Sequence, residues 1–255
     1  MNCPGCGAEI PDNSNLCLRC GQMIQPAQAS VQLDFGGTAM QLFGWMLLAI
    51  VATLVVVPLA WVQAAMNRWF CRSLKFSDGT TATFRGTGGQ VVGWMILYLV
   101  VIVGYQVANS QAAKAGIVSS LLLLVVYFFA LPAIILKLIG WSVSNVGFGA
   151  GPPLSFTGTY GGFVGWYLLL VISPFTIIGW AWAIAGMYRW YARNTHGQGI
   201  EFRFHGQGQQ ILWRTLVFAL ASVLIIPIPW MALWFMRWFV QNTSFTRSAS
   251  AAVVA

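Results

Sequence analysis

The sequence predicts an all-α integral membrane protein with four internal repeats, short β-strands at the repeat junctions and a small N-terminal zinc ribbon. Three observations carry this prediction. Apolar residues make up 58% of the chain and charged residues only 7%. Long apolar stretches recur, and a short phrase ending in Phe-x-Gly opens each repeat. So few charged side chains cannot cover a water-facing surface, which places the chain in a membrane.

Residues 1–22 form the predicted zinc ribbon. Two Cys-x-x-Cys-Gly knuckles, separated by ten residues, supply the four thiolates of Cys3, Cys6, Cys17 and Cys20. Four thiolates can hold one zinc ion tetrahedrally and leave no position for water, so the zinc is expected to be structural. A unit this small has no core, and the metal must supply much of its folding free energy. A rubredoxin-like iron site and a pair of redox dithiols remain as alternatives.

The ribbon pattern resembles the short zinc ribbons found at the ends of many bacterial proteins, which implies a cytoplasmic interaction or structural module. Reduced thiolates ahead of the first apolar stretch also predict a cytoplasmic N-terminus. Met1 leads directly into the polar ribbon, so no cleavable signal peptide is expected. Residues 23–30, within a Gln- and Ala-rich run, read as a flexible linker.

The repeats are predicted at 31–79, 80–151, 152–199 and 200–245, followed by a flexible tail at 246–255. Each opens on a Phe with Gly two residues later, at Phe35, Phe84, Phe156 and Phe204. Three close on Arg followed by two aromatic residues, beginning at Arg68, Arg189 and Arg237, each with Trp seven residues earlier. The second repeat is longer, and Lys137 stands near its Arg position. Self-similarity of this kind is typical of repeat proteins.

Five apolar stretches near or above the length of a spanning helix lie at 40–66, 91–108, 117–139, 163–188 and 211–236. The second repeat contains two of them and is expected to cross the membrane twice. The other repeats contain one stretch each, broken near its middle by Pro58, by Pro174, or by Pro227 with Pro229. Each of these is either a kinked span running into an interfacial helix or a shallow re-entrant hairpin.

Charge placement favours repeats that return to their starting side. Of thirteen Lys and Arg, only Lys114 lies in the turn inside the second repeat. If every repeat returned, the other twelve would be cytoplasmic, as the positive-inside rule requires. The net charge of +8 then indicates contacts with anionic lipid headgroups, and no nucleic acid is expected. About 26 residues is nevertheless too short for two full spans, so the number of crossings stays open.

The junctions are predicted to contain strands. Val31–Phe35 and Ile200–Phe204 alternate apolar and polar residues, and Leu74–Thr80 reads as a hairpin with an Asp-Gly turn. If the junctions share one side of the membrane, four such strands could form a small sheet on its surface.

Phe204-His205-Gly206 before an apolar stretch, and Arg189-Trp190-Tyr191 followed by Asn194-Thr195 after one, resemble the YjgN-like family of bacterial integral membrane proteins. The resemblance covers most of residues 31–245 and is clearest in 152–245. The second repeat departs from it, because Trp141-Ser142 stands in place of the Asn-Thr pair, and the ribbon is not part of the family pattern. The resemblance implies the architecture and a multi-pass inner-membrane location, and it implies no activity.

The candidate functional residues favour a non-enzymatic role. All five carboxylates lie outside the apolar stretches, whereas ion-coupled transport and acid–base catalysis usually need paired or intramembrane carboxylates. His196 and His205 are expected to be ordinary loop histidines, and Cys71 a buried or idle thiol. The predicted function is a membrane-embedded scaffold or accessory subunit that meets a protein partner through the ribbon and junction strands. The alternative is a channel or carrier for a neutral or lipid-like solute.

Overall fold

The computed structural model describes residues 6–9, 17, 19–20, 30–55, 57–149, 151–176, 178–197, 199–223 and 227–247. These residues are mostly helical, with eight strands between the helices. From Ser30 onward they form four segments, each with the order strand, helix, helix, strand. We number these segments one to four: residues 30–76, 82–148, 155–197 and 200–247.

Segments one and two contain the following elements: β1 (Ser30–Phe35), α1 (Ala39–Val55), α2 (Leu59–Ser73), β2 (Leu74–Phe76), and β3 (Ala82–Phe84), α3 (Gly88–Ala115), α4 (Ile117–Ser144), β4 (Val146–Phe148). Segments three and four contain β5 (Ser155–Phe156), α5 (Tyr160–Ile172), the 3-10 helix η1 (Ser173–Thr176), α6 (Gly179–Arg193), β6 (Thr195–Gly197), and β7 (Ile200–Phe204), α7 (Gly208–Ser222), α8 (Ile228–Gln241), β8 (Thr243–Arg247). The last strand extends two residues into the predicted tail, since Thr246 pairs with Ser30 and Arg247 with Ile200.

The two strands that flank each helical hairpin pair with one another, antiparallel and in one common register. In every segment the Phe of the Phe-x-Gly phrase lies opposite the first residue of the closing strand: Phe35 and Leu74, Phe84 and Val146, Phe156 and Thr195, Phe204 and Thr243. Both ends of each hairpin therefore return to the strand layer.

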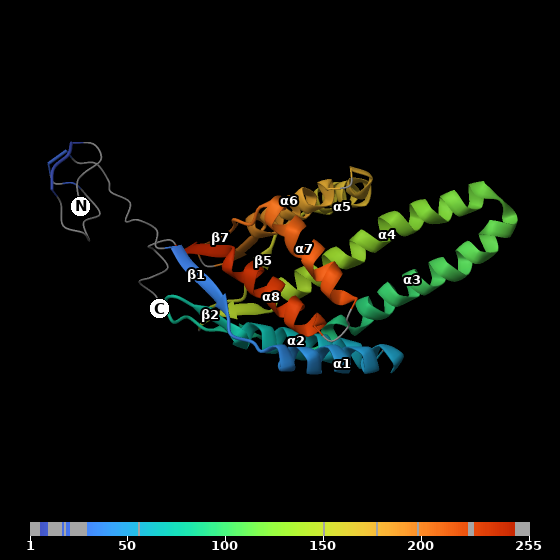
Figure 1. Cartoon of the computed structure of the whole chain (residues 1–255), viewed down its shortest axis with the longest axis horizontal. Helices are drawn as coiled ribbons and strands as arrows, with labels where there is room; N and C mark the ends of the chain where they lie inside the picture. Colours follow the sequence, from blue (N-terminus) through green and yellow to red (C-terminus); the bar gives the residue numbers. More distant parts are fainter. Residues whose placement is uncertain are drawn as a thin grey trace.

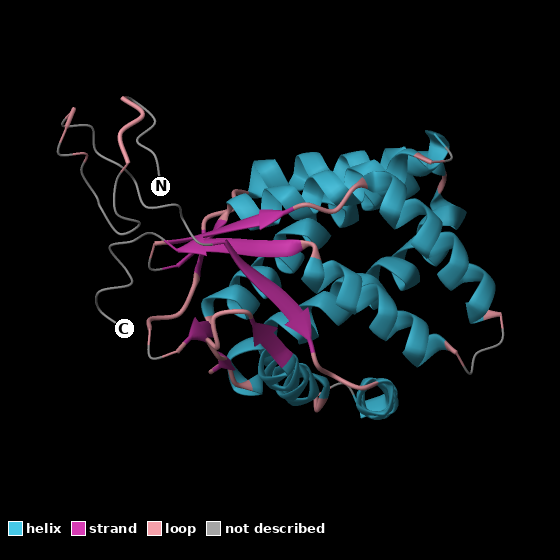
Figure 2. Ribbon diagram, turned by 60° about the vertical axis from the view of Figure 1, so that its left-hand side comes forward, coloured by secondary structure: helices cyan, strands magenta, loops and turns pink. Residues whose placement is uncertain are grey.

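Neighbouring segments join through further pairing of β1 with β8 and of β6 with β7. The result is a six-stranded sheet of order β2-β1-β8-β7-β6-β5, with β3 and β4 as a separate pair. The strands gather at one end of the molecule and the helices extend away from it (Figure 2), with α3 and α4 reaching furthest (Figure 1). The predicted hairpin across Leu74–Thr80 is wrong: Asp78-Gly79 connects two segments, because β2 pairs with β1 and β3 with β4.

The helical hairpins close into a ring. The second helix of each segment packs on the first helix of the next: α2 on α3, α4 on α5, α6 on α7, and α8 on α1. Four phenylalanines from the strands, Phe76, Phe148, Phe202 and Phe245, pack together with ring centroids 5.4–6.0 Å apart. Phe245 is fully buried. This aromatic cluster forms the core where the strand layer meets the helices.

The proline-broken stretches are helical hairpins, in which two helices meet at the proline. Pro58 caps the start of α2, Pro174 lies in η1, and Pro227 caps the start of α8. Proline cannot donate the backbone hydrogen bond of a continuing helix, and each stretch therefore turns at that point. Among the described residues, only the helices at Gly88–Gln111 and Ile117–Ser144 are long and apolar enough to cross a membrane, with mean hydropathies of 2.1 and 2.6.

The most exposed apolar side chains lie near the hairpin turns, far from the sheet. Leu54 near the end of α1 is 81% exposed, Phe175 in η1 87%, and Val223 after α7 80%. A water-soluble domain rarely exposes apolar patches of such extent. Exposed apolar side chains therefore concentrate at the ends of the hairpins.

Candidate functional site

One aromatic contact recurs in all four segments and explains the Phe-x-Gly phrase. The Phe ring packs edge-on against the Trp of the closing helix, in the pairs Phe35–Trp69, Phe84–Trp141, Phe156–Trp190 and Phe204–Trp238, at interplanar angles of 80–89°. The Gly two residues on lies against both rings. A Cβ at Gly86 would come within 2.6 Å of Phe84 Cζ and 3.0 Å of Trp141 Cζ2. Only glycine fits at such a close approach.

The arginine of the Arg-aromatic phrase binds the next segment. Arg68 Nη2 donates to Gly86 O at 2.8 Å, Arg189 Nη2 to Gly206 O at 2.9 Å, and Arg237 Nη2 to Gly37 O at 3.1 Å. The acceptor is the glycine of the following Phe-x-Gly phrase, and the last arginine closes the ring onto the first segment. In segment two, Gly140 precedes Trp141 and so holds the arginine position. Lys137, which was expected near that position, lies three residues before it.

An asparagine ends the closing helix in three segments. Asn145, Asn194 and Asn242 each donate from Nδ2 to the carbonyl of the Trp four residues earlier, at 2.8 Å. Segment two therefore does contain the asparagine of the predicted Asn-Thr pair. The sequence comparison missed it because Val146 follows in place of threonine.

The junction between segments three and four holds a basic cavity of about 570 Å³. From α6 come Arg189 and Arg193, and from β7 come Arg203 and Glu201. Arg203 Nη2 lies 3.9 Å from Glu201 Oε2, with both side chains more than 60% exposed, so this ion pair contributes little to stability. Three guanidinium groups facing one carboxylate make the cavity electropositive.

Both histidines line this cavity, His196 from β6 and His205 just after β7. His205 Nε2 lies 2.8 Å from Ser244 Oγ, which holds the ring beside the strand pair β7 and β8. From the sequence, each of the two histidines was expected to be an ordinary loop residue. Their common position beside three arginines makes them candidate ligand-binding groups.

Two further cavities lie nearby, and each shares lining residues with the one before it. A cavity of about 170 Å³ shares Ala192, Thr195, Phe202 and Phe204 with the basic cavity. It also shares Tyr188 and Phe239 with an apolar cavity of about 460 Å³. That third cavity is lined only by helices, namely α2, α6, α7 and α8. The three cavities thus form a row in which the lining changes from charged to aromatic to apolar.

The corresponding junction between segments four and one lacks this charge. Counted from the conserved Trp and Phe positions of each segment, Gln241 replaces Arg193 and Asp34 replaces Arg203. Gln241 Nε2 donates to Asp34 Oδ1 at 3.0 Å. This hydrogen bond, followed by one from a backbone amide at Phe35, lowers the pKa of the Asp34 carboxyl below its ordinary value. At this junction a hydrogen bond between a neutral amide and a carboxylate stands where the other junction has two arginines.

The guanidinium group of Arg214 lies among the indole rings of three tryptophans. Arg214 Cζ stands 4.6 Å from the ring centroid of Trp213, 4.7 Å from Trp238 and 5.2 Å from Trp234. Arg214 Nη1 also donates to Gln210 O at 3.3 Å. Arg214 holds the position at which the first three segments have Trp, ten residues after the Phe. Cation–π attraction to three rings stabilises a charge at this apolar place.

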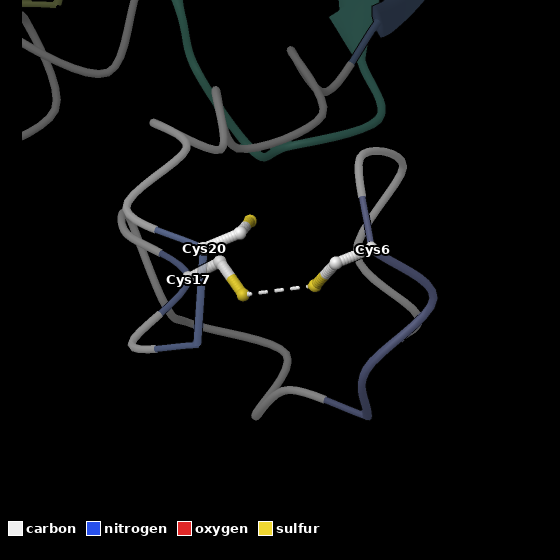
Figure 3. A group of neighbouring side chains, drawn as sticks. All are labelled: Cys6, Cys17 and Cys20. Carbon is white, nitrogen blue, oxygen red and sulfur yellow. Dashed lines mark hydrogen bonds between the residues drawn. The ribbon is translucent and has the colours of Figure 1, made fainter.

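Three of the four predicted zinc ligands lie together. The sulfur atoms of Cys6, Cys17 and Cys20 are all within 4.8 Å of one another, and Cys6 Sγ is 3.6 Å from Cys17 Sγ (Figure 3). That distance is too long for a disulfide. Tetrahedral zinc with bonds of about 2.3 Å places its sulfur ligands about 3.8 Å apart, close to the Cys6–Cys17 distance. Cys3, the fourth predicted ligand, lies outside the described residues.

Cys71 is the fifth cysteine of the chain. It is only 3% exposed and belongs to the apolar cluster beneath the sheet. Its side chain fills the space between α2 and the strands.

The chain has no match among the known proteins with which it was compared, whether family models, curated proteins or solved structures. The resemblance to the YjgN-like family therefore stays a prediction.

Proposed function

We propose that this chain is a membrane-embedded scaffold or accessory subunit of a bacterial inner membrane, with its sheet and a zinc ribbon on the cytoplasmic side. The observation that supports this most is the strand layer: each hairpin returns both ends to it, while the apolar turns point away. A polar, strand-rich end opposite an apolar end suits a protein that sits in one face of a bilayer and meets partners on that face.

We infer that the four segments are internal repeats of one unit. The common strand register, the four edge-on Phe–Trp pairs and the arginine-to-glycine bonds support this. Four different ancestors would have no reason to place the same side chains in the same contacts. Membership of the YjgN-like family is proposed on the same segments.

Helix lengths support a mixed insertion. Helices α3 and α4 have 28 residues each, or about 42 Å at 1.5 Å per residue. The helices of the other hairpins have 13 to 17 residues, or about 20–26 Å, against about 30 Å of hydrocarbon core. We propose that α3 and α4 cross the membrane and that the other three hairpins are re-entrant from the cytoplasmic side. Of the thirteen Lys and Arg, only Lys114 then lies at the far end of the membrane-crossing hairpin, which agrees with the positive-inside rule.

A topology scan tests this arrangement. Single reporter cysteines at Thr87, Asn109 and Gly197, in a chain with the other cysteines replaced, are probed with a membrane-impermeant thiol reagent on intact cells. We expect only the reporter at Asn109, near the end of α3, to be labelled. Labelling of only one of the two junction reporters, Thr87 or Gly197, would contradict the common cytoplasmic face. It would also contradict the scaffold proposal.

We propose that Cys3, Cys6, Cys17 and Cys20 hold one structural zinc, and that the ribbon recruits a protein partner. The three neighbouring sulfurs support this. Purified protein should contain one zinc per chain, and Cys17→Ser, at the fully buried ligand, should lose it. Co-purification of the same partners with intact protein and with protein lacking residues 1–22 would rule out recruitment by the ribbon.

The second candidate function is a carrier for a lipid-like solute. The row of three cavities between the sheet and the helices favours it. Vesicles that contain the purified protein and show no lipid movement beyond protein-free vesicles would remove this candidate. Enzymatic activity is not proposed, since Glu201 is the one carboxylate that lines these three cavities among the described residues, and it faces Arg203.

A further inference from the structure

We propose that the row of cavities between segments three and four binds an anionic amphiphile, namely a lipid with a phosphate-bearing headgroup and a hydrocarbon chain. The headgroup would occupy the basic cavity and the chain the apolar cavity. This inference goes beyond the scaffold role and holds whether or not the sheet recruits a protein.

The basic cavity has the chemistry of a phosphate site. Arg189, Arg193 and Arg203 present guanidinium donors from two different elements, and guanidinium groups bind phosphate oxygens in pairs of parallel hydrogen bonds. Arg189 uses one nitrogen to hold Gly206 O, which fixes its orientation and leaves its other donors for a ligand. The cavity volume of about 570 Å³ falls in the usual range for small-molecule sites.

The apolar cavity has the chemistry of a chain site. Aromatic and aliphatic side chains form most of its lining, including Phe70, Phe218 and Phe235. The ring centroids of Tyr188 and Phe239 lie 4.1 Å apart where this cavity meets the aromatic one. Rings at this distance touch and close the gap between the two cavities, so an entering hydrocarbon chain would displace them and then bury its surface against theirs, which is favourable in proportion to the area buried.

The order of the cavities, from basic to apolar, follows the molecule from the strand layer to the helices. The basic cavity lies at the sheet, where strand residues contribute to it, and the apolar cavity lies among helices alone. A lipid in the sheet-side leaflet has its headgroup and chain in this same order. A free phosphate ester would not need the apolar cavity, and a neutral solute would not need three arginines.

The first experiment measures lipid preference. Purified full-length protein in detergent is titrated with fluorescent phosphatidylglycerol and with phosphatidylcholine of the same chains. We expect about tenfold or tighter binding of phosphatidylglycerol, as two charge-assisted hydrogen bonds would give. Glycerol 3-phosphate at millimolar concentration should not displace it. Equal binding of the two lipids overturns the proposal, and displacement by glycerol 3-phosphate reassigns the site to a free phosphate ester.

The second experiment removes the charge. The double variant Arg193→Gln, Arg203→Asp gives this junction the residues that the junction between segments four and one already contains, so it should fold. Its matched control, Arg72→Gln with Arg85→Asp, makes the same charge change at exposed positions of segments one and two. Phosphatidylglycerol preference should vanish in the first and persist in the second. Equal loss in both would mean general surface attraction and would overturn the site. If the double variant fails to fold, Arg193→Gln alone decides by the same criterion.

The third experiment fills the chain cavity. Thr215→Phe places a ring among its lining residues, and Thr53→Phe makes the same change on an exposed face of α1. We expect Thr215→Phe to weaken phosphatidylglycerol binding about tenfold through lost chain contacts, and Thr53→Phe to leave it unchanged. Unchanged binding in Thr215→Phe would overturn the chain site.

Discussion

Two junctions of the ring share one framework and differ in charge. Between segments three and four, Arg189 binds Gly206 O, and between segments four and one, Arg237 binds Gly37 O. Strand pairing also links both junctions, through β6 with β7 and through β8 with β1. Around this framework the first junction has a basic cavity, whereas the second has the bond between Gln241 and Asp34.

The comparison separates what the fold needs from what it permits. One arginine, one glycine and the strand pairing hold a junction together in both places. The extra arginines at 193 and 203 are not required for closure, because the second junction closes without them. Their charge costs self-repulsion, so a role outside folding is the better explanation for their presence.

The largest expected effect concerns the shared glycines. Gly206→Ala and Gly37→Ala should each destabilise the protein by about 1–3 kcal/mol, because the new methyl group overpacks the Phe and Trp rings. Gly44→Ala is the control, since a Cβ there meets nothing within 4 Å. It should stabilise α1 by up to about 1 kcal/mol. The free energy of unfolding of the three variants is measured in mixed detergent micelles. A change of the same sign for Gly44→Ala and Gly206→Ala would contradict the role given to the shared glycines.

The sharpest result would be new lipid binding at the junction between segments four and one. Asp34→Arg with Gln241→Arg gives the second junction the arginines of the first. We expect the number of bound phosphatidylglycerol molecules per chain to rise, with an affinity about tenfold above that for phosphatidylcholine. Native mass spectrometry counts the bound lipids. An unchanged count would show that the two junctions differ in shape as well as in charge.

Removing the shared arginine should have a moderate effect at either junction. Arg189→Gln and Arg237→Gln each delete one hydrogen bond to a glycine carbonyl, worth about 1 kcal/mol. Arg237→Gln should also speed amide hydrogen exchange in β1, since it loosens the closure between the first and last segments. Arg72→Gln serves as the surface control and should change stability by less than about 0.5 kcal/mol. Faster amide hydrogen exchange in β1 of the Arg72→Gln control would contradict the assignment of this effect to the hydrogen bond between Arg237 and Gly37.

The smallest effect is a pH dependence confined to the second junction. The hydrogen bond from Gln241 lowers the pKa of Asp34 in the folded state. Its stabilisation is therefore fully present above the ordinary carboxyl pKa and is lost as the pH falls through the lower folded value. Solvent screening keeps the contribution small, because Asp34 is exposed. The stability of Gln241→Leu should converge with that of the unchanged chain as the pH falls below the folded-state pKa of Asp34. A stability difference that stays constant as the pH falls from neutral through the ordinary carboxyl pKa and below would contradict this.

Periodicity in the sequence predicted the strands and helix breaks best. The alternation in Val31–Phe35 and Ile200–Phe204 predicted β1 and β7 correctly, because one face of each strand is buried against the aromatic cluster. Proline marked the hairpin turns. Strand pairing was predicted wrongly at Asp78-Gly79, since a local turn signal carries no information about partners that lie a whole helical hairpin away.

The basic cavity was missed because its residues were considered one at a time. Glu201, Arg203 and His205 alternate along a strand and so share one face, while Arg189 and Arg193 are four apart on a helix and share another. These two patterns were visible in the sequence. The strand face and the helix face meet because α6 packs beside β7. No local sequence pattern specifies that packing.

Ring closure also bears on the order of events during synthesis. The contacts that close the ring join residues 200 and 207 positions apart, Arg237 with Gly37 and Gln241 with Asp34. A ribosome releases the chain from its N-terminus, so β1 must wait with an unpaired edge until β8 has emerged. Contacts of such sequence separation form late and slowly. Until that moment the first segment depends on β2 alone, and a chaperone or the membrane surface has to cover its open edge.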